Sequence, residues 1–167
     1  MQRLALLGAN PGITNEYERA ARRAADDRLA QHLLEVGVPA FIAEWIALPL
    51  FAGLTLTDTD RAERLANTAE GLASSLQFCG AGTQLPLWDR LLELTMPVLT
   101  LAGSLDDAYE AIGERIAHTV PDGKFATIHG VGHAAHLQSP TQVITRLEGW
   151  LAATRHVAHR PPPSPPR

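Results

Sequence analysis

Cysteine, aromatic side chains and long apolar runs are all scarce in this chain of 167 residues. Cys79 is the only cysteine, so no disulfide can form within the chain, and this fits a reducing compartment. No apolar run approaches the roughly 20 residues of a membrane-spanning helix, and the run from Leu4 to Leu7 is too short for a secretory signal. We therefore expect a cytoplasmic protein that does not enter a membrane.

Positive charge is also lacking, because 14 lysines and arginines face 18 acidic residues, for a net charge of −4. This balance argues against a broad basic surface for nucleic acid or for anionic lipid. Aromatic residues make up only 5%, but the apolar fraction of 46% is ordinary for a globular protein. The length favours a single domain with room for a substantial core.

The first 94 residues combine one short strand with a long helical region. The apolar run from Leu4 to Leu7 predicts a buried strand within residues 1–13, because it is continuous and is stopped by glycines and a proline. Residues 14–94 carry helical patterns and no strand signal. A helix capped by Thr14 or Asn15 should run to about residue 36, where Gly37 ends it. A further helix is predicted over 39–51, with a break at Pro49. One or two helices are predicted over 57–79, with Thr57 or Asp58 as the N-cap, and another is predicted over 85–94.

The pattern changes over residues 95–154, which alternate between strand and helix. Strands are predicted over 96–103 and 125–129, and an amphipathic helix is predicted over 106–120. A closing helix should start at Pro140 with Ser139 as its cap. Strand, helix, strand, helix is typical of a parallel sheet in an α/β fold. The tail, residues 155–167, is rich in proline and is expected to be disordered, although a proline-binding partner of the SH3 or WW type is an alternative.

Two residues that could carry chemistry follow the two strands of this last region. Asp106 comes just after the strand over 96–103, and His133 comes just after the strand over 125–129. The carboxyl ends of parallel strands meet at one edge of a sheet, where catalytic groups gather. An aspartate can hold an imidazole in one tautomer, and the histidine can then take a proton from a nucleophile. The alternative is that Asp106 caps the following helix and that His133 is an ordinary loop residue.

Other polar residues give weaker signals. His133 and His136 are three apart, but no HExxH pattern and no third ligand accompany them, so we expect no metal and no cofactor. Arg22, Arg23 and Arg64 lie in the helical region, where a guanidinium could bind a carboxylate or could simply belong to a solvated helix face. Trp45 could line a ligand site or belong to the core.

A serine nucleophile in its usual setting is absent from the sequence. No G-x-S-x-G motif, which forms the sharp turn between a strand and a helix, occurs in the 167 residues. Ser74 and Ser75 lie in a helical run, and Ser104 is beside the proposed acid. Cys79 also lacks the context of a nucleophile.

Several segments together resemble the 2-succinyl-6-hydroxy-2,4-cyclohexadiene-1-carboxylate synthases of menaquinone biosynthesis, a family with the α/β-hydrolase fold. The resemblance extends from Leu4 to about Leu151. The stretch "RLANTAEGLASSLQFCGAGTQLPLWDRL" is similar to a distinctive part of that family, and "FIAEWIALPLFAG" is similar to its lid segment. The stretches "PVLTLAGSLDDAY" and "GVGHAAHLQSP" resemble the segments that carry the acid and the histidine across α/β-hydrolases.

The resemblance implies a partial α/β-hydrolase fold: a helical lid plus the last three parallel strands, with the N-terminal half outside this sequence. It implies Asp106 as the triad acid and His133 as the triad base. Arg22 (or Arg23), Trp45 and Arg64 would line the site of a small-molecule carboxylate substrate. Two positions depart from the family pattern, since Gln77 stands where an arginine is usual and Gln138 where a glutamate is usual.

Three functions remain open at this point. The chain could be part of a lyase that eliminates pyruvate, inactive alone because its serine is absent. It could instead be part of a generic ester hydrolase, or a non-catalytic chain that docks on a partner. A sheet that begins with the strand at Leu4 would have an open edge, through which copies of the chain could associate.

Overall fold

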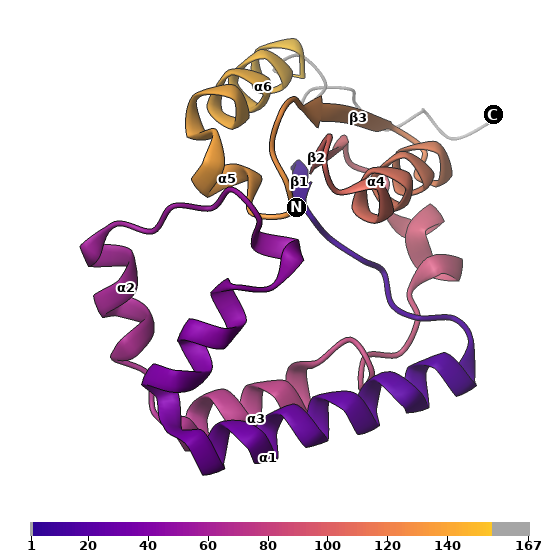
Figure 1. The fold of residues 1–167 in the computed structure, drawn as a ribbon. Coiled ribbons are helices and arrows are strands. Elements are labelled where there is room, and N and C mark those ends of the chain that lie inside the picture. The colour runs from indigo at the N-terminus through magenta and orange to yellow at the C-terminus, as the bar shows by residue number, and fades with distance from the viewer. Residues whose placement is uncertain (1, 155–167) are drawn as a thin grey trace, which may run out of the picture.

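A computed structural model describes residues 2–154, so the proline-rich tail lies outside the described residues. Its centre is a sheet of three parallel strands in the order β1-β2-β3 (Figure 1). The strands are β1 (Leu4–Leu7), β2 (Val98–Gly103) and β3 (Gly123–Ile128). Leu4 pairs with Val98, and Val98 pairs with Gly123. The predicted parallel sheet is therefore confirmed, with both later strands starting about two residues from their expected positions.

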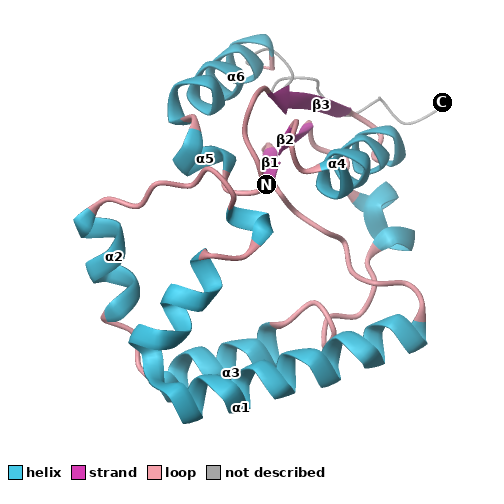
Figure 2. Cartoon of the chain, in the orientation of Figure 1, coloured by secondary structure: helices cyan, strands magenta, loops and turns pink. Residues whose placement is uncertain are grey.

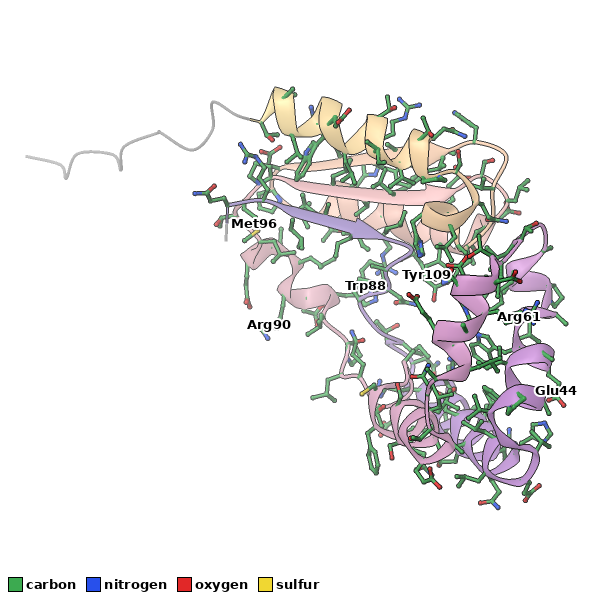
Figure 3. All side chains as sticks on the ribbon, turned by 90° about the vertical axis from the view of Figure 1, so that its left-hand side faces the viewer. Glu44, Arg61, Trp88, Arg90, Met96 and Tyr109 are labelled. Carbon is green, nitrogen blue, oxygen red and sulfur yellow. The ribbon has the colours of Figure 1, made fainter. Side chains whose placement is uncertain are left out.

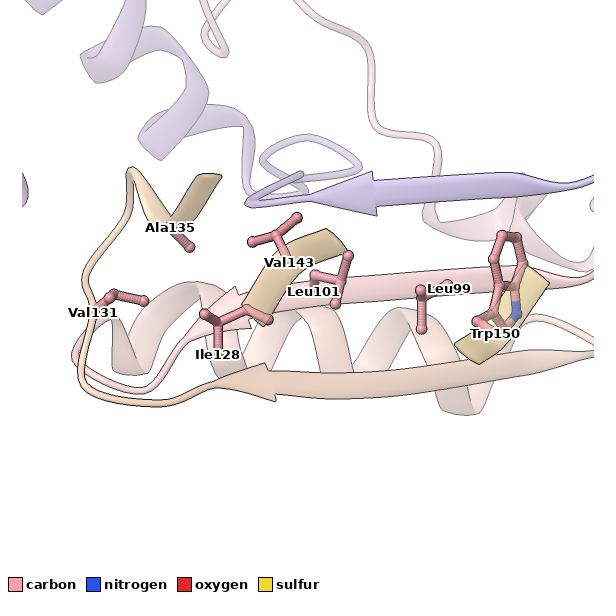
Figure 4. Packing of buried hydrophobic residues seen from close by; sticks show 7 residues of the cluster. All are labelled: Leu99, Leu101, Ile128, Val131, Ala135, Val143 and Trp150. Carbon is pink, nitrogen blue, oxygen red and sulfur yellow. The ribbon is translucent and has the colours of Figure 1, made fainter. Parts of the chain in front are cut away.

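The central strand β2 is buried along its whole length because helices cover both of its faces. On one face, Leu99 and Leu101 pack with Trp150 of helix α6 (Pro140–Ala153), as Figure 4 shows. On the other face, Val98 packs with Ile116 of helix α4 (Asp107–Thr119). Successive side chains of a strand point to opposite faces, so a continuous apolar run suits this central position.

The long region between β1 and β2 is helical and contains no strand (Figure 2). Helix α1 (Glu16–Ile46) starts behind Asn15, whose side chain accepts hydrogen bonds from the backbone of Tyr17 and Glu18. Gly37 interrupts it with φ 78° and ψ 165°, a conformation that is essentially restricted to glycine, so two helical pieces result as predicted. The following elements are η1 (Pro49–Phe51), α2 (Asp58–Leu65), α3 (Ala69–Cys79) and η2 (Trp88–Glu93).

Helices α1 and α3 pack side by side, away from the sheet (Figures 1 and 3). Their shared apolar core contains only residues between Leu29 and Leu76, and Leu33 is fully buried in it. The chain after α3 passes so close to α1 that a Cβ at Gly82 would lie 2.4 Å from the backbone nitrogen of Arg23. We call residues 14–82 the lid. No helix among residues 2–154 is long and apolar enough to cross a membrane.

The structure differs from the local predictions in three places. The helix expected over 85–94 is the 3₁₀ helix η2, which has no side-chain cap and packs against the sheet through Leu91. Ser139 is the N-cap residue of α6 as predicted, but its hydroxyl accepts a hydrogen bond from Gln142 Nε2 instead of from a backbone amide. A short helix, α5 (Ala135–Gln138), was not foreseen.

Candidate functional site

The loops that follow β2 and β3 meet at one edge of the sheet. The backbone nitrogen of Leu105 donates to the carbonyl of Val131 over 2.9 Å, so the two loops are joined directly. Their approach depends on Gly103, since a Cβ there would lie 2.3 Å from the carbonyl oxygens of both Val131 and Gly132. The close approach places the side chains of Asp106 and His133 beside each other.

Asp106 and His133 form a hydrogen-bonded pair. Nδ1 of His133 lies 2.7 Å from Oδ2 of Asp106, and the two side chains are 24% and 9% exposed. Asp106 directly precedes α4 but makes no capping hydrogen bond, so its carboxylate serves the histidine rather than the helix. An ionised carboxylate can only accept, so Nδ1 carries the proton and neutral His133 has its lone pair at Nε2. No described residue hydrogen-bonds to Nε2.

Two further residues hold the imidazole ring in place. The ring of Tyr109, which is on the first turn of α4 and is labelled in Figure 3, lies 4.5 Å from that of His133 between centroids, at 60°. On another side, a Cβ built at Gly8 would lie 3.3 Å from Cε1 of His133. Gly8 has φ 55°, so glycine suits both its backbone and the space available. Neither residue was predicted, and the only available signal for Tyr109 is its position one helical turn after Asp106.

A small pocket of about 80 Å³ opens beside the pair. One wall comes from Asp106, Gly132 and His133, and the other comes from η1 and the residue after it, through Pro49, Leu50 and Ala52. The lid therefore reaches the histidine through η1 rather than through its longer helices. The η1 segment and His133 thus line the same pocket.

The three predicted substrate residues lie on the lid. Trp45 stacks on Phe41 at 5.7 Å between ring centroids and lies 6.1 Å from Phe51 of η1. It also lines a second, mostly apolar pocket of about 220 Å³ between α1 and α3, together with Phe41, Ile42, Leu72, Ser75 and Leu76. Phe51 contacts Trp45 and directly follows Leu50, which lines the pocket at His133, so Trp45 lies next to the segment that forms one side of that pocket.

The arginines are held by neighbouring residues of the lid. Nε of Arg22 donates to both oxygens of the buried Asp26, at 2.8 and 3.0 Å. Arg23 donates to the carbonyl of Gly82, and Arg64 donates to that of Asp60. Among residues 2–154, none of these arginines lines the pocket at His133, so the described structure does not bring them to the pair.

No serine is placed to be activated by His133 within the described residues. Ser104 is the serine closest to Asp106 in sequence, and its hydroxyl accepts a hydrogen bond from the backbone of Gly130. Within residues 2–154, no group of three or more histidine, cysteine, aspartate or glutamate side chains is arranged to hold a metal ion.

Known proteins are similar to this chain over most of its length. No protein-family model matches the chain. A putative 2-succinyl-6-hydroxy-2,4-cyclohexadiene-1-carboxylate synthase of Bacillus subtilis (strain 168) is 34% identical over 142 residues, which are 82% of this chain and 52% of that protein. The synthase of that name from Salmonella heidelberg (strain SL476) is 32% identical over 146 residues, covering 86% of this chain and 56% of that protein. The chain spans about half the length of these curated relatives.

Solved structures show the same relationship. The structure of MenH from S. aureus matches with a TM-score of 0.87 and 31% identity, over 93% of this chain and 60% of that one. A thermophilic esterase from Thermogutta terrifontis matches with a TM-score of 0.70 and 24% identity, which shows a shared fold only. Most of this chain therefore has a counterpart in part of a larger protein of known structure, the S. aureus MenH.

Proposed function

Because this chain has part of an α/β-hydrolase fold and resembles 2-succinyl-6-hydroxy-2,4-cyclohexadiene-1-carboxylate synthases over most of its length, we propose that it provides the acid, the base and the lid of such a lyase. The observation that carries the proposal is the 2.7 Å hydrogen bond between His133 Nδ1 and Asp106. It leaves Nε2 as the basic nitrogen of His133, a residue that lines a pocket together with Pro49, Leu50 and Ala52 of the lid. We also propose that the lyase works in the cytoplasm, which suits a chain whose only cysteine is free.

The pair would act on a serine that these 167 residues do not contain. Nε2 of His133 takes the proton of the serine hydroxyl, and Asp106 stabilises the imidazolium that results. The activated serine then removes a proton from the substrate, and the electron pair left behind expels pyruvate. The substrate proton restores the serine hydroxyl, and His133 gives its own proton to the pyruvate enolate that leaves, so no metal or organic cofactor is part of the scheme. The chain alone should show no turnover that depends on this pair.

The lid would bind the carboxylates of the substrate. Nε of Arg22 is fixed by Asp26, while the two terminal nitrogens of Arg22 have no hydrogen-bond partner among the described residues. A guanidinium held in this way presents a planar pair of donors that matches a carboxylate. Arg64 would add a second positive charge, and Trp45 would supply an apolar wall beside η1.

The rest of the fold would join at β1. This strand pairs with β2 on one side only, so its other edge is open in the described structure. We propose that a strand carrying the serine pairs there, and self-association through the same edge is the competing outcome.

The proposal can be tested by co-expressing this chain with the serine-bearing N-terminal part of the Bacillus subtilis relative. Two activities are measured: formation of 2-succinyl-6-hydroxy-2,4-cyclohexadiene-1-carboxylate with release of pyruvate, and hydrolysis of simple aryl esters. We expect the first activity, and we expect His133→Ala to abolish it. His129→Ala, in the same loop but exposed, is the matched control and should leave it unchanged.

The alternatives predict different results. Ester hydrolysis without lyase activity would replace the proposal by a hydrolase. Size-exclusion chromatography separates the remaining case, because a chain that forms only copies of itself and never binds the N-terminal part contradicts both enzymes.

A further inference from the structure

The side chain of Gln138, the last residue of α5, forms hydrogen bonds both to the loop that carries His133, which we call the histidine loop, and to the lid. Its Oε1 accepts a hydrogen bond from the backbone nitrogen of Gly132 at 2.8 Å, directly before His133. Its Nε2 donates to the carbonyl of Ala52 at 3.0 Å, directly after η1. The side chain is half-buried between the two segments.

This bridge is unusual because the lid and the core otherwise share little polar contact. Within residues 2–154, the bond from Gln138 to Ala52 is the single hydrogen bond that joins residues 16–82 to residues 88–154. Helices α1 and α3 form their own apolar core, so their packing does not fix η1 against the sheet. The carbonyl of Leu50 also approaches Gly132, at 3.7 Å from the position of a Cβ there. Among the hydrogen bonds of the described residues, the bridge through Gln138 is therefore the one that ties the η1 segment to the core.

We propose that Gln138 is a positioning residue that couples the lid to the histidine loop. The amide performs both tasks, since it offers an acceptor to Gly132 and a donor to Ala52. A carboxylate accepts from Gly132 but has no hydrogen to donate to Ala52. The proposal does not depend on which reaction the site performs, because it concerns the position of η1 and of the loop around His133.

Hydrogen exchange on the full chain of 167 residues tests this coupling. The reporters for the lid are the amides of Phe51, Ala52 and Leu54, which are hydrogen-bonded within η1 and the turn after it. The reporter for the loop is the amide of Gly132. Each rate is converted to an opening equilibrium constant, and the constant of the Leu101 amide in the central strand, which reports global unfolding, is subtracted from it. Gln142→Glu is the matched control, because the amide of Gln142, in α6, accepts from and donates to the backbone of His129 and makes no hydrogen bond to the lid.

The variants should separate the two tasks of the side chain. In Gln138→Glu, the lid amides should exchange roughly 2- to 10-fold faster while Gly132 stays protected, because only the donor is lost. In Gln138→Met, Gly132 should also exchange faster by a similar factor, and the Nδ1–H resonance of His133 should broaden as the loop loosens. Gln142→Glu should change none of these signals.

Two results would overturn the coupling. One is a Gln138→Glu variant whose lid amides exchange at the rate of the unmodified chain. The other is a Gln142→Glu variant that speeds the lid amides as much as Gln138→Glu does, since the effect would then come from added charge rather than from the bridge.

Discussion

Replacing Gly103 by alanine should break the candidate site from within the fold. Gly103 ends β2, and a Cβ there would lie 2.3 Å from two carbonyl oxygens of the histidine loop, those of Val131 and Gly132. Real Cβ atoms essentially never approach other atoms within 3.0 Å, so strand and loop must move apart by at least about 0.7 Å. Both obstacles are backbone atoms, which cannot rotate away as a side chain could. A shift of this size at Gly132 carries the adjacent His133 away from Asp106.

The expected magnitude follows from overpacking in a buried place. Such substitutions typically cost about 1–3 kcal/mol, and the rigid obstacles place Gly103→Ala at about 3 kcal/mol or above. The control is Gly149→Ala, because Gly149 lies within α6 and nothing occupies the space around its Cβ position. Gly149→Ala should instead stabilise the chain by roughly 0.5–1 kcal/mol, as alanine does in helices. Urea denaturation measures both free energies of unfolding, and NMR follows the Nδ1–H resonance of His133.

The reasoning fails if Gly103→Ala unfolds within about 0.5 kcal/mol of the unmodified chain while it keeps that resonance. The loops after β2 and β3 would then move apart without breaking the hydrogen bond between His133 and Asp106. Equal effects of the two substitutions would likewise show that close approach at Gly103 is not what matters.

Three further predictions concern the pair, the lid and the pH dependence of one helix end. Asp106→Ala removes the acceptor for Nδ1–H, so denaturation should show a loss of about 1–3 kcal/mol, whereas the exposed neighbour Asp107→Ala should cost less than about 1 kcal/mol. Leu33→Ala should cost about 2–5 kcal/mol in the same assay because Leu33 is fully buried in the lid, while Leu34→Ala, 47% exposed, should stay within about 0.5 kcal/mol. The hydroxyl and backbone of Thr57 lower the pKa of Asp60, so Thr57→Val should raise the pKa of Asp60 toward its ordinary value in a carbon-13 titration. Since a lowered pKa stabilises the folded form at higher pH, the start of α2 should loosen as the pH falls below about 4. An Asp60 pKa that is unchanged in Thr57→Val would contradict the role of Thr57 in lowering it.

Much of the fold could be predicted because its signals are local. The run from Val98 to Gly103 is apolar except for Thr100, and it forms the strand that is buried on both faces. Gly37 ended a helical pattern in the sequence, and in the structure it has the backbone angles that only glycine adopts readily. The prediction of an α-helix over 85–94 was wrong because the apolar spacing of this segment fits an α-helix, whereas packing against the sheet favours the tighter 3₁₀ helix η2 over so short a stretch.

The candidate site was predictable only in part, for a physical reason. Asp106 and His133 each follow a strand, and adjacent parallel strands bring their ends together, so the sequence order predicts their meeting. Tyr109 and Gln138 make their contacts through the tertiary fold, and Gln138 reaches Ala52 across 86 positions of the chain. No local pattern marks such a bridge. The roles predicted for Arg22, Trp45 and Arg64 stay predictions, since their described contacts are with residues of the lid.

The central claim is that Asp106 and His133 form a pair ready to activate a serine. The most direct measurement is the rate at which a fluorophosphonate probe labels the serine of the N-terminal part, when that part is co-expressed with this chain. The account predicts labelling that falls by about 100-fold or more in His133→Ala and is unchanged in His129→Ala. Labelling that is equally fast in His133→Ala would contradict it.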